Sequence, residues 1–389
     1  MNHHLPLLLA AISPLAACVS YSRSVYTTRS VSMNHKSERE VTLPLAIAAG
    51  QSLRVATKFG AIRAKARPAC PTPQVRVHLE IHARTKAEAE MALAQFEPRA
   101  TATANGLELK IHGDPIVVID DSMRIELQPM VDFEIEVPDG VRLEALTQSG
   151  EVVAEGALAG VTLESNFGRV AATGIRGPVM MTASSGALQL DDCTGDIEGR
   201  STYGNVTASK VRSSTVDLST SSGNIELEDA SATTTKLHTK YGTVTVRNAT
   251  GALDLDSGSG DIRVQKANGS LRAVTRYGSI DAQGLWRSLD LRSSSGSVAA
   301  RADAGSVMAT AWTLESTYGS VRLDAPAAFA CNLEAATKYG DAKCEFGLLL
   351  PEGSTPQTGQ LTGVVGNGGQ LVRLLSGSGD VTLAKLATQ

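Results

Sequence analysis

One short phrase returns along most of this chain: a hydroxyl residue, two further positions, a glycine, and an aliphatic residue at the second position after the glycine. One copy reads Ser201-Thr-Tyr-Gly204-Asn-Val206. A fixed period near 20 residues is typical of stacked structural units that share a core only with their neighbours. The step is 18 or 19 residues for the first nine of the following glycines and looser for the rest, all of which we expect to be repeat corners: Gly150, Gly168, Gly186, Gly204, Gly223, Gly242, Gly260, Gly278, Gly296, Gly319, Gly340 and Gly379.

A single repeat contains two short strands. After Gly223, Ile225 and Leu227 alternate with polar residues, and after a small polar turn Leu237 and Thr239 alternate again before the next glycine. One such unit cannot bury its own apolar face, whereas coils stacked about 4.8 Å apart close a core and pair their backbones. We therefore predict an all-β fold with a parallel β-solenoid of about 18–19 residues per coil over residues 144–389.

The predicted core is visible as columns of aliphatic residues. The residues two and four positions after the glycines are almost uniformly Val, Ile, Leu or Ala. The glycine itself is expected to supply a positive φ at a tight corner, where a β-carbon would clash. The hydroxyl residue three positions before it is expected to bond the local turn backbone.

The residue before each glycine follows a finer rhythm, in which serine and an aromatic residue alternate. Equivalent residues on successive coils lie one strand spacing apart, so rings on every coil would be forced to stack face to face. Alternation gives each ring a serine on either side, and the effective repeat is two coils. The sequence order is Ser149, Phe167, Ser185, Tyr203, Ser222, Tyr241, Ser259, Tyr277, Ser295 and Tyr318.

Residues 41–143 are predicted to form a separate β module that precedes the regular repeat. Strands are expected at 75–81, 107–111 and 133–137, where apolar and polar residues alternate. Residues 85–96 are predicted to be helical, with Thr85 as the cap. An outlying copy of the repeat phrase ends at Gly60.

The N-terminus resembles a bacterial lipoprotein signal. Residues 1–17 contain an apolar run that is too short to cross a bilayer, which needs about 20 helical residues, and that fits a signal peptide. Small residues then precede Cys18, as in a lipobox, which implies lipidation of Cys18. Ordinary secretory cleavage nearby is the alternative. Residues 18–40 are predicted to be a flexible tether, and Val19 favours the outer membrane of the cell envelope.

Four cysteines follow Cys18. Cys331 and Cys344 flank one turn of the repeat with inward parity and form the better candidate pair, although two buried free thiols fit equally well, since facing sheets lie about 10 Å apart. Cys70 and Cys193 have no evident partner.

The composition disfavours nucleic acid as a partner. The chain has 36 basic and 40 acidic residues, a near balance that lacks the concentrated basic face of a nucleic-acid-binding protein. Partners are expected instead to be the membrane, through the lipid, and an envelope protein or glycan.

Several groups of polar residues are candidate sites, and each has a simpler structural explanation. Gly258-Ser-Gly260-Asp261 and Gly377-Ser-Gly379-Asp380 only approach the calcium-binding turn of other solenoids, and ordinary turns explain them better. His78, Glu80 and His82 share one strand face and could bind a metal, although a solvated face is the commoner reading. We therefore expect no metal and no cofactor.

The candidate catalytic groups also have a simpler explanation. Asp254, Asp256 and Asp261, with Lys240, Arg276 and Lys338, are spaced as exposed repeat positions, so no enzyme activity is expected. A groove with converging carboxylates would instead favour a carbohydrate-active solenoid. Trp286 and Trp312 lie outside the strict repeat and are expected to be packing residues, with contact to a ligand as the alternative.

The repeated [Ser/Thr]-x-[Tyr/Ser]-Gly-x-[Ile/Val] turns resemble the bacterial DUF4097 family, which is described as adhesins with a β-strand repeat. The closing stretch Gly366-Asn-Gly-Gly-Gln-Leu-Val and Ser376-Gly-Ser-Gly379-Asp-Val-Thr-Leu383 is similar to it as well. The resemblance covers residues 41–389 and implies an envelope β-solenoid, right-handed, without established enzymatic activity. The adhesin label of that family rests largely on its fold. A non-catalytic adhesin, scaffold or binding protein is the expected function, with a carbohydrate-active or carbohydrate-binding β-helix as the alternative.

Overall fold

The computed structural model describes residues 33–68, 70–120, 123–350 and 358–386. Cys18, the predicted signal peptide and most of the predicted tether lie outside these residues. Almost every element in the described part is a β-strand, and its one helix is far too short to span a membrane.

The N-terminal elements are β1 (His35–Pro44), β2 (Ser52–Phe59), β3 (Ile62–Arg67), β4 (Gln74–Ala83), α1 (Lys86–Ala94), β5 (Glu97–Thr103), β6 (Gly106–His112), β7 (Ile116–Asp120), β8 (Met123–Leu127) and β9 (Met130–Pro138). The repeat contains β10 (Arg142–Ser149), β11 (Val152–Glu155), β12 (Gly160–Ser165), β13 (Val170–Thr173), β14 (Val179–Ala183), β15 (Leu188–Asp191), β16 (Ile197–Ser201), β17 (Val206–Thr220), β18 (Ile225–Thr239), β19 (Val244–Ser257), β20 (Ile262–Thr275), β21 (Ile280–Ser293), β22 (Val298–Ala302), β23 (Trp312–Ser316), β24 (Val321–Ala325), β25 (Cys331–Thr337), β26 (Ala342–Cys344), β27 (Leu348–Leu349), β28 (Gln360–Val365), β29 (Leu371–Ser376) and β30 (Val381–Lys385).

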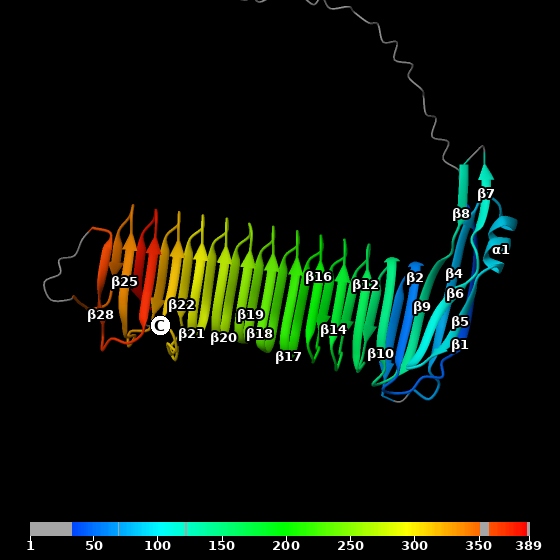
Figure 1. Cartoon of the computed structure of the whole chain (residues 1–389), viewed down its shortest axis with the longest axis horizontal. Coiled ribbons are helices and arrows are strands. Elements are labelled where there is room, and N and C mark those ends of the chain that lie inside the picture. Colours follow the sequence, from blue (N-terminus) through cyan, green and yellow to red (C-terminus); the bar gives the residue numbers. More distant parts are fainter. Residues whose placement is uncertain (1–32, 69, 121–122, 351–357, 387–389) are drawn as a thin grey trace, which may run out of the picture.

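Successive coils stack as a parallel β-solenoid, which confirms the predicted fold (Figure 1). In each coil one strand follows the corner glycine and a second strand leads to the next corner. β15, which comes after a corner glycine, pairs in parallel with β13 and β17. β16, which comes before the next corner, pairs in parallel with β14 and β17. From β17 to β21 the two segments merge into long strands of 14 or 15 residues, and from β22 onward they are separate again. The rod therefore has two main faces that enclose a continuous core.

The first coil of the stack lies far upstream of the regular repeat. β2 and β3 pair in parallel with β10 and β11, so the phrase ending at Gly60 forms a corner directly next to Gly150. The intervening residues build the N-terminal end of the rod, where β6 pairs with β2 and β9 pairs with β3. Residues 35–40, assigned to the tether by sequence, belong to β1, which pairs with β4.

The helix α1 covers the sheet at this end and packs on β1 and β4. Thr85 caps it as predicted, and its hydroxyl accepts a hydrogen bond from the Glu88 backbone N–H at 3.2 Å. This bond satisfies one of the N–H groups that a helix leaves unpaired at its start. Ala89, Ala92 and Leu93 form its buried face.

The C-terminal coil does not occupy the last position of the stack. β29 pairs in parallel with both β23 and β25, and β30 pairs with both β24 and β26. The chain therefore passes over one coil position after β24 and fills it later with its own C-terminal strands. In Figure 1 the red strands accordingly stand between neighbours of earlier sequence. β28 and β27 pair antiparallel beyond β25 at this end.

The aliphatic columns of the repeat point inward and are buried, as predicted. Trp286 and Trp312 are fully buried. The indole Nε1 of Trp286 donates to the Arg301 carbonyl at 2.9 Å, and the Trp312 ring stacks on Phe329 with centroids 5.6 Å apart. Both tryptophans are therefore packing residues of the C-terminal half.

The cysteines of the described chain are all free thiols. Cys331 is buried in β25, and burial raises the pKa of its thiol to about 12. Burial also raises the pKa of the Cys193 thiol, which occupies the buried column that Val211 fills one coil later. Of the alternatives left open for Cys331 and Cys344, the structure has two thiols.

The corners differ from the sequence-based expectation in one respect. Among the predicted corner glycines of the described chain, only Gly150 has a positive φ, so the expected left-handed conformation is wrong for the others. These positions require glycine because the coils approach closely there. A β-carbon on Gly242 would lie 1.9 Å from the carbonyl oxygen of Gly223, and one on Gly186 would lie 1.7 Å from that of Gly168.

The hydroxyl before each corner connects two coils. The Ser257 hydroxyl donates to the Gly242 carbonyl of the preceding coil at 2.9 Å and accepts the N–H of Gly260 at 2.9 Å. The bond to the preceding carbonyl recurs from Thr147 to Ser376, with Ala183 as the exception. The predicted bond to the turn backbone is thus present, and a second bond joins the coil below.

The left-handed residues lie at the other end of the strand, six positions after the corner. This column contains Asp192, Lys210, Asp229, Asn248 and Lys266, all with φ between 51° and 53°. In the first coils the same column contains Gly156 and Gly174. Left-handed backbone costs a non-glycine residue about 1–2 kcal/mol, so glycine would fit every position in this column.

The exceptional Ala183 provides a test of the hydroxyl column. Ala183→Ser should add the missing bond to the Gly168 carbonyl and raise the free energy of unfolding by about 0.5–1.5 kcal/mol. Ser257→Ala should lower it by about 1–3 kcal/mol, because buried backbone groups lose their partner. Denaturant unfolding of the two variants measures both changes. Equal stability of wild type and both variants would contradict the proposed role of the hydroxyls.

Close approach at the corner predicts a large effect of a single methyl group. Gly242→Ala should destabilise the protein by more than about 3 kcal/mol, since backbone must move to admit the β-carbon. Gly347→Ala is the matched control, because a β-carbon there meets nothing within 4 Å, and it should change stability by less than about 0.5 kcal/mol. Thermal unfolding followed by circular dichroism distinguishes them, and similar midpoints would refute the steric explanation.

Candidate functional site

A row of exposed aromatic side chains runs along the corner edge of the rod. We call it the aromatic row: Phe59, Phe167, Tyr203, Tyr241, Tyr277, Tyr318 and Tyr339. All are 65–70% exposed except Phe59, which is 39% exposed. Every tyrosine in the described part of the chain lies in this row. Tyrosine is therefore absent from the described core and concentrated on one line of the surface.

The alternation of ring and serine is stricter in space than in the sequence. Sequence order places Tyr318 and Tyr339 next to each other, which breaks the rhythm. In the stack, the corner of Gly379 lies between those of Gly319 and Gly340. The serine of the C-terminal coil, Ser378, therefore falls between the two tyrosines and restores the alternation.

The same holds at the N-terminal end of the row. The corner of Gly60 lies directly before that of Gly150, so Phe59 is followed by Ser149 and then by Phe167. Rings therefore recur at every second coil from the first coil to the last. With coils about 4.8 Å apart, neighbouring rings are spaced by roughly 9.6 Å.

Basic side chains precede several of these rings. Lys58, Lys240, Arg276 and Lys338 stand one residue before an aromatic, and no acidic residue occupies the equivalent position of any coil. Within the described chain none of these four cations has an ion-pair partner. The ammonium groups of Lys58 and Lys338 lie 5.4 and 5.2 Å from the centroids of their neighbouring rings.

Carboxylates on the other side of the corner are already engaged. Glu151 pairs with Arg63 and Arg169, and Asp261 pairs with Arg263. Asp261 also accepts the Ser279 backbone N–H at 2.9 Å, and Asp380 accepts that of Asp341 at 3.0 Å. The two aspartates considered for calcium thus bond backbone between coils. The unpaired charges on this edge are therefore the four cations that precede the rings and, within the described chain, the carboxylate of Asp380, which bonds only a backbone N–H.

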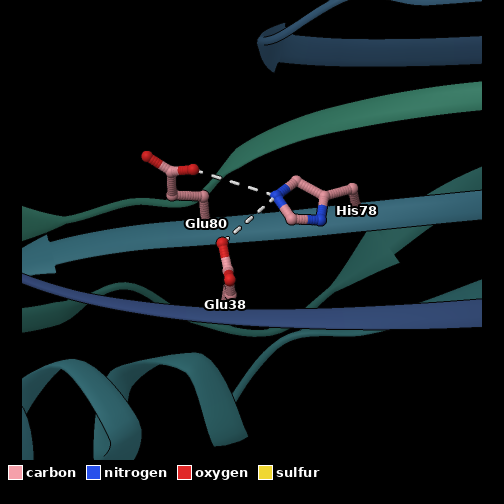
Figure 2. A group of neighbouring side chains, drawn as sticks. All are labelled: Glu38, His78 and Glu80. Atoms are coloured by element: carbon pink, nitrogen blue, oxygen red, sulfur yellow. Dashed lines mark ion pairs between the residues drawn. The ribbon is translucent and has the colours of Figure 1, made fainter.

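The histidine strand forms a different cluster at the N-terminal end (Figure 2). Glu38 of β1 and Glu80 of β4 are directly opposed across the antiparallel pair, and His78 Nε2 lies 3.9 and 3.8 Å from their carboxylates. The side chain of Glu80 is only 13% exposed. Ligand atoms of these three residues lie within 4.8 Å of one another, which a metal ion could bridge.

Lys36 takes the position that a cation would occupy in this cluster. Its ammonium lies 2.9 Å from Glu38 and 2.8 Å from Glu80. Hydrogen bonds from Lys36 and then from His82 lower the pKa of Glu80. The hydrogen bonds that Lys36 makes to Glu80 and to Glu38 raise the pKa of Lys36 above its usual range. Two opposed carboxylates would repel each other, and the lysine offsets that repulsion. The cluster is therefore complete as a cross-strand ion-pair network.

An open groove of about 820 Å³ crosses one face of the rod over β10, β12, β14, β16 and β17. Its lining includes Glu144, Asp196, Glu198 and Asp217, with the exposed Met180 between them. Glu198 and Asp217 are register partners on adjacent strands, and Glu198 is held by Arg200 at 2.8 Å. This is the arrangement that would favour a carbohydrate-active protein.

The aspartates that the sequence offered as catalytic candidates do not converge. Asp254 pairs with Arg272 at 2.8 Å and Asp256 lies 3.3 Å from His238, each along an exposed strand face. Sequence reasoning missed the participation of Glu38, which it placed in a tether. It also missed the groove, because neither its residues nor their spacing differ from those of ordinary exposed repeat positions.

Comparison with known proteins gives one clear relationship. A model of the family described as Toastrack DUF4097 matches residues 128–302 and 194–384. No curated protein matches the chain. A solved structure from Clostridium sporogenes, described as a "putative cell adhesion protein", aligns at 10% sequence identity over 90% of this chain and 100% of that chain, with a TM-score of 0.17.

A second structure, from Bacteroides fragilis and described as a "putative adhesin", aligns at 12% identity over 90% of this chain and 97% of that chain, with a TM-score of 0.23. The family match spans most of the described solenoid, including the corner glycines from Gly150 to Gly379. The chain therefore belongs to the DUF4097, or Toastrack, family.

Proposed function

We propose that this protein is a non-catalytic binding rod of the cell envelope, held to a membrane by lipid on Cys18, whose aromatic row is the contact surface for adhesion. The row is the observation that carries this proposal. Each ring stands in water although the next coil in the stack has serine at the same corner, so the fold itself does not require an aromatic residue there. Exposed tyrosines on a rigid scaffold are typical of interfaces, because they supply contact area at low entropic cost.

The rod geometry supports a role in binding at a distance from a membrane. The first described strand begins at His35, close to the end of the rod where the coils start, so a lipid on Cys18 would attach that end. The aromatic row then runs away from the attachment along the whole stack. An elongated ligand, or several ligands in succession, could contact the rod at once.

The groove over β10–β17 supports a second candidate function, a carbohydrate-active protein. Its carboxylates Glu198 and Asp217 are register partners on adjacent strands, and a glycoside-cleaving enzyme uses two carboxyl groups that flank the scissile bond. Both carboxylates are solvent-accessible and therefore have similar surroundings. Such enzymes instead place their two carboxylates in contrasting surroundings, which separate the two pKa values. Release of reducing ends from a polysaccharide, lost in Glu198→Gln, would establish this candidate over the first.

The lipid anchor predicts how the protein fractionates. In cells that export the full chain, the wild type should sediment with membranes and dissolve in detergent. Cys18→Ser should shift it to the soluble fraction, because the acyl chains supply the membrane affinity. Immunoblots of the fractions and metabolic labelling with a fatty acid measure this. Unlabelled wild-type protein, or an unchanged distribution of the variant, would contradict the anchor.

The aromatic row can be tested with substitutions that the chain itself uses. Tyr203→Ser, Tyr241→Ser and Tyr277→Ser together should leave the unfolding midpoint nearly unchanged and reduce binding of the purified exported protein to envelope fractions by at least about ten-fold. The reason is the loss of three exposed ring contacts. Binding is measured by surface plasmon resonance on immobilised envelope.

The matched control carries Lys210→Gly, Asn248→Gly and Lys266→Gly at the far ends of the strands, where glycine suits the left-handed backbone. It should bind as the wild type does. Equal loss in both triple variants, or no loss in the tyrosine variant, would refute the row as the contact surface.

A further inference from the structure

The identity of the ligand follows from the chemistry of the aromatic row, and this step rests on the proposed function. We propose that the row binds a linear acidic polysaccharide that lies along the rod, with sugar rings on the aromatic side chains and sugar carboxylates on the adjacent lysines and arginine.

The rings provide platforms for sugars. Tyr203, Tyr241 and Tyr277 are 65–70% exposed, so their faces and hydroxyl groups are accessible. A pyranose has an apolar C–H face and a polar rim, and it matches a side chain with a hydrophobic ring and a hydrogen-bonding tip. The serine hydroxyls between the rings add further hydrogen-bonding groups along the same line.

The spacing of the rings suits a polymer with a two-residue repeat. Rings recur every second coil, roughly 9.6 Å apart, without interruption along the stack. In a linear polysaccharide with two-fold screw symmetry, every second sugar turns the same face to one side. The length of this two-sugar repeat is comparable to the spacing of the rings. Many weak contacts in register can then act together, which raises avidity without any deep pocket.

The charge of the edge selects an acidic polymer. The whole chain has a formal net charge of −4, yet the position before the rings contains Lys58, Lys240, Arg276 and Lys338 and no acidic residue. These cations have no ion-pair partner within the described chain. Of the nearby carboxylates, Glu151 and Asp261 are paired elsewhere and Asp380 accepts a backbone N–H, so the four cations outnumber the unpaired carboxylate. Unpaired cations beside exposed rings can therefore bind carboxylates without first losing an existing ion pair.

Single-stranded nucleic acid is the other polymer that combines rings with negative charge. Proteins that bind it stack successive bases on aromatic residues within a continuous basic groove. Here the rings are separated by serine coils and the cations occur on only some of the ring-bearing coils. The aromatic row is also an edge, and the groove over β10–β17 has more carboxylates than basic side chains in its lining. The polysaccharide is therefore the better match.

The test uses the full exported chain and defined probes. Binding of polygalacturonate, of its methyl-esterified neutral form, of polyglutamate and of oligothymidylate is measured by isothermal titration at two salt concentrations. We expect polygalacturonate to bind at least about ten-fold more tightly than the other three probes and to weaken with salt. The tyrosine triple variant should lose at least about ten-fold in affinity.

A pair of charge-matched variants separates specific from general electrostatics. Lys240→Ser with Arg276→Ser should weaken polygalacturonate binding by about three- to ten-fold. Lys210→Gly with Lys266→Gly removes the same charge at the far strand ends and should leave the affinity unchanged. Equal weakening by the two pairs would overturn the site, because net charge alone would then explain binding.

Each remaining outcome also decides the inference. Equal binding of the neutral ester overturns the acidic class, and equal binding of polyglutamate or oligothymidylate overturns the polysaccharide. If no polysaccharide binds while envelope binding still depends on the tyrosines, the inference fails and the proposed function stands. If envelope binding is independent of the tyrosines too, both fail.

Discussion

The structure depends on the contact between the corner of one coil and the corner beneath it. At each corner a glycine without a β-carbon lies against the carbonyl group of the previous glycine, and a buried hydroxyl bonds that same carbonyl. A side chain at the glycine would separate the coils, and an unpaired carbonyl would be costly at this depth. The parallel strand ladders set the spacing of adjacent coils, and the corner contact lets the chain turn at that same spacing. The corner therefore allows the turns to match the pitch of the rod, and the core fills the space between its two faces.

The repeat could be predicted from the sequence because each coil uses the same residues for the same reasons. Val206, Ile225 and Val244 show the inward column directly, and Thr85 marks the start of the helix. The conformation of the glycines could not be predicted in this way. The recurring spacing of the glycines indicates that a β-carbon is excluded at these positions. It does not distinguish a left-handed backbone from a close approach between coils. Only the position of the preceding carbonyl decides between them.

The spatial order of the coils could not be predicted from the sequence either. Adjacent copies in a repeat are expected to be adjacent in space, yet the coil of Gly60 lies against that of Gly150 and the coil of Gly379 lies between those of Gly319 and Gly340. The pattern of Phe59, Ser149, Tyr318, Ser378 and Tyr339 becomes regular only when this order is known. The candidate site is therefore a property of the stack, and the sequence shows only its central portion. Glu38 was missed for a related reason, because β1 pairs with a strand far along the chain.

The regular exchange of ring and serine limits how such a rod can change in length. Gain or loss of one coil would bring two rings together, or two serines, and would shift every later ring by half a period. Gain or loss of two coils preserves the pattern. Gene duplications that lengthen this protein should consequently be retained in units of about 36 residues, which is twice the 18-residue step between corners such as Gly150 and Gly168. The surface pattern, more than the core, would then restrict the number of coils to changes of two at a time.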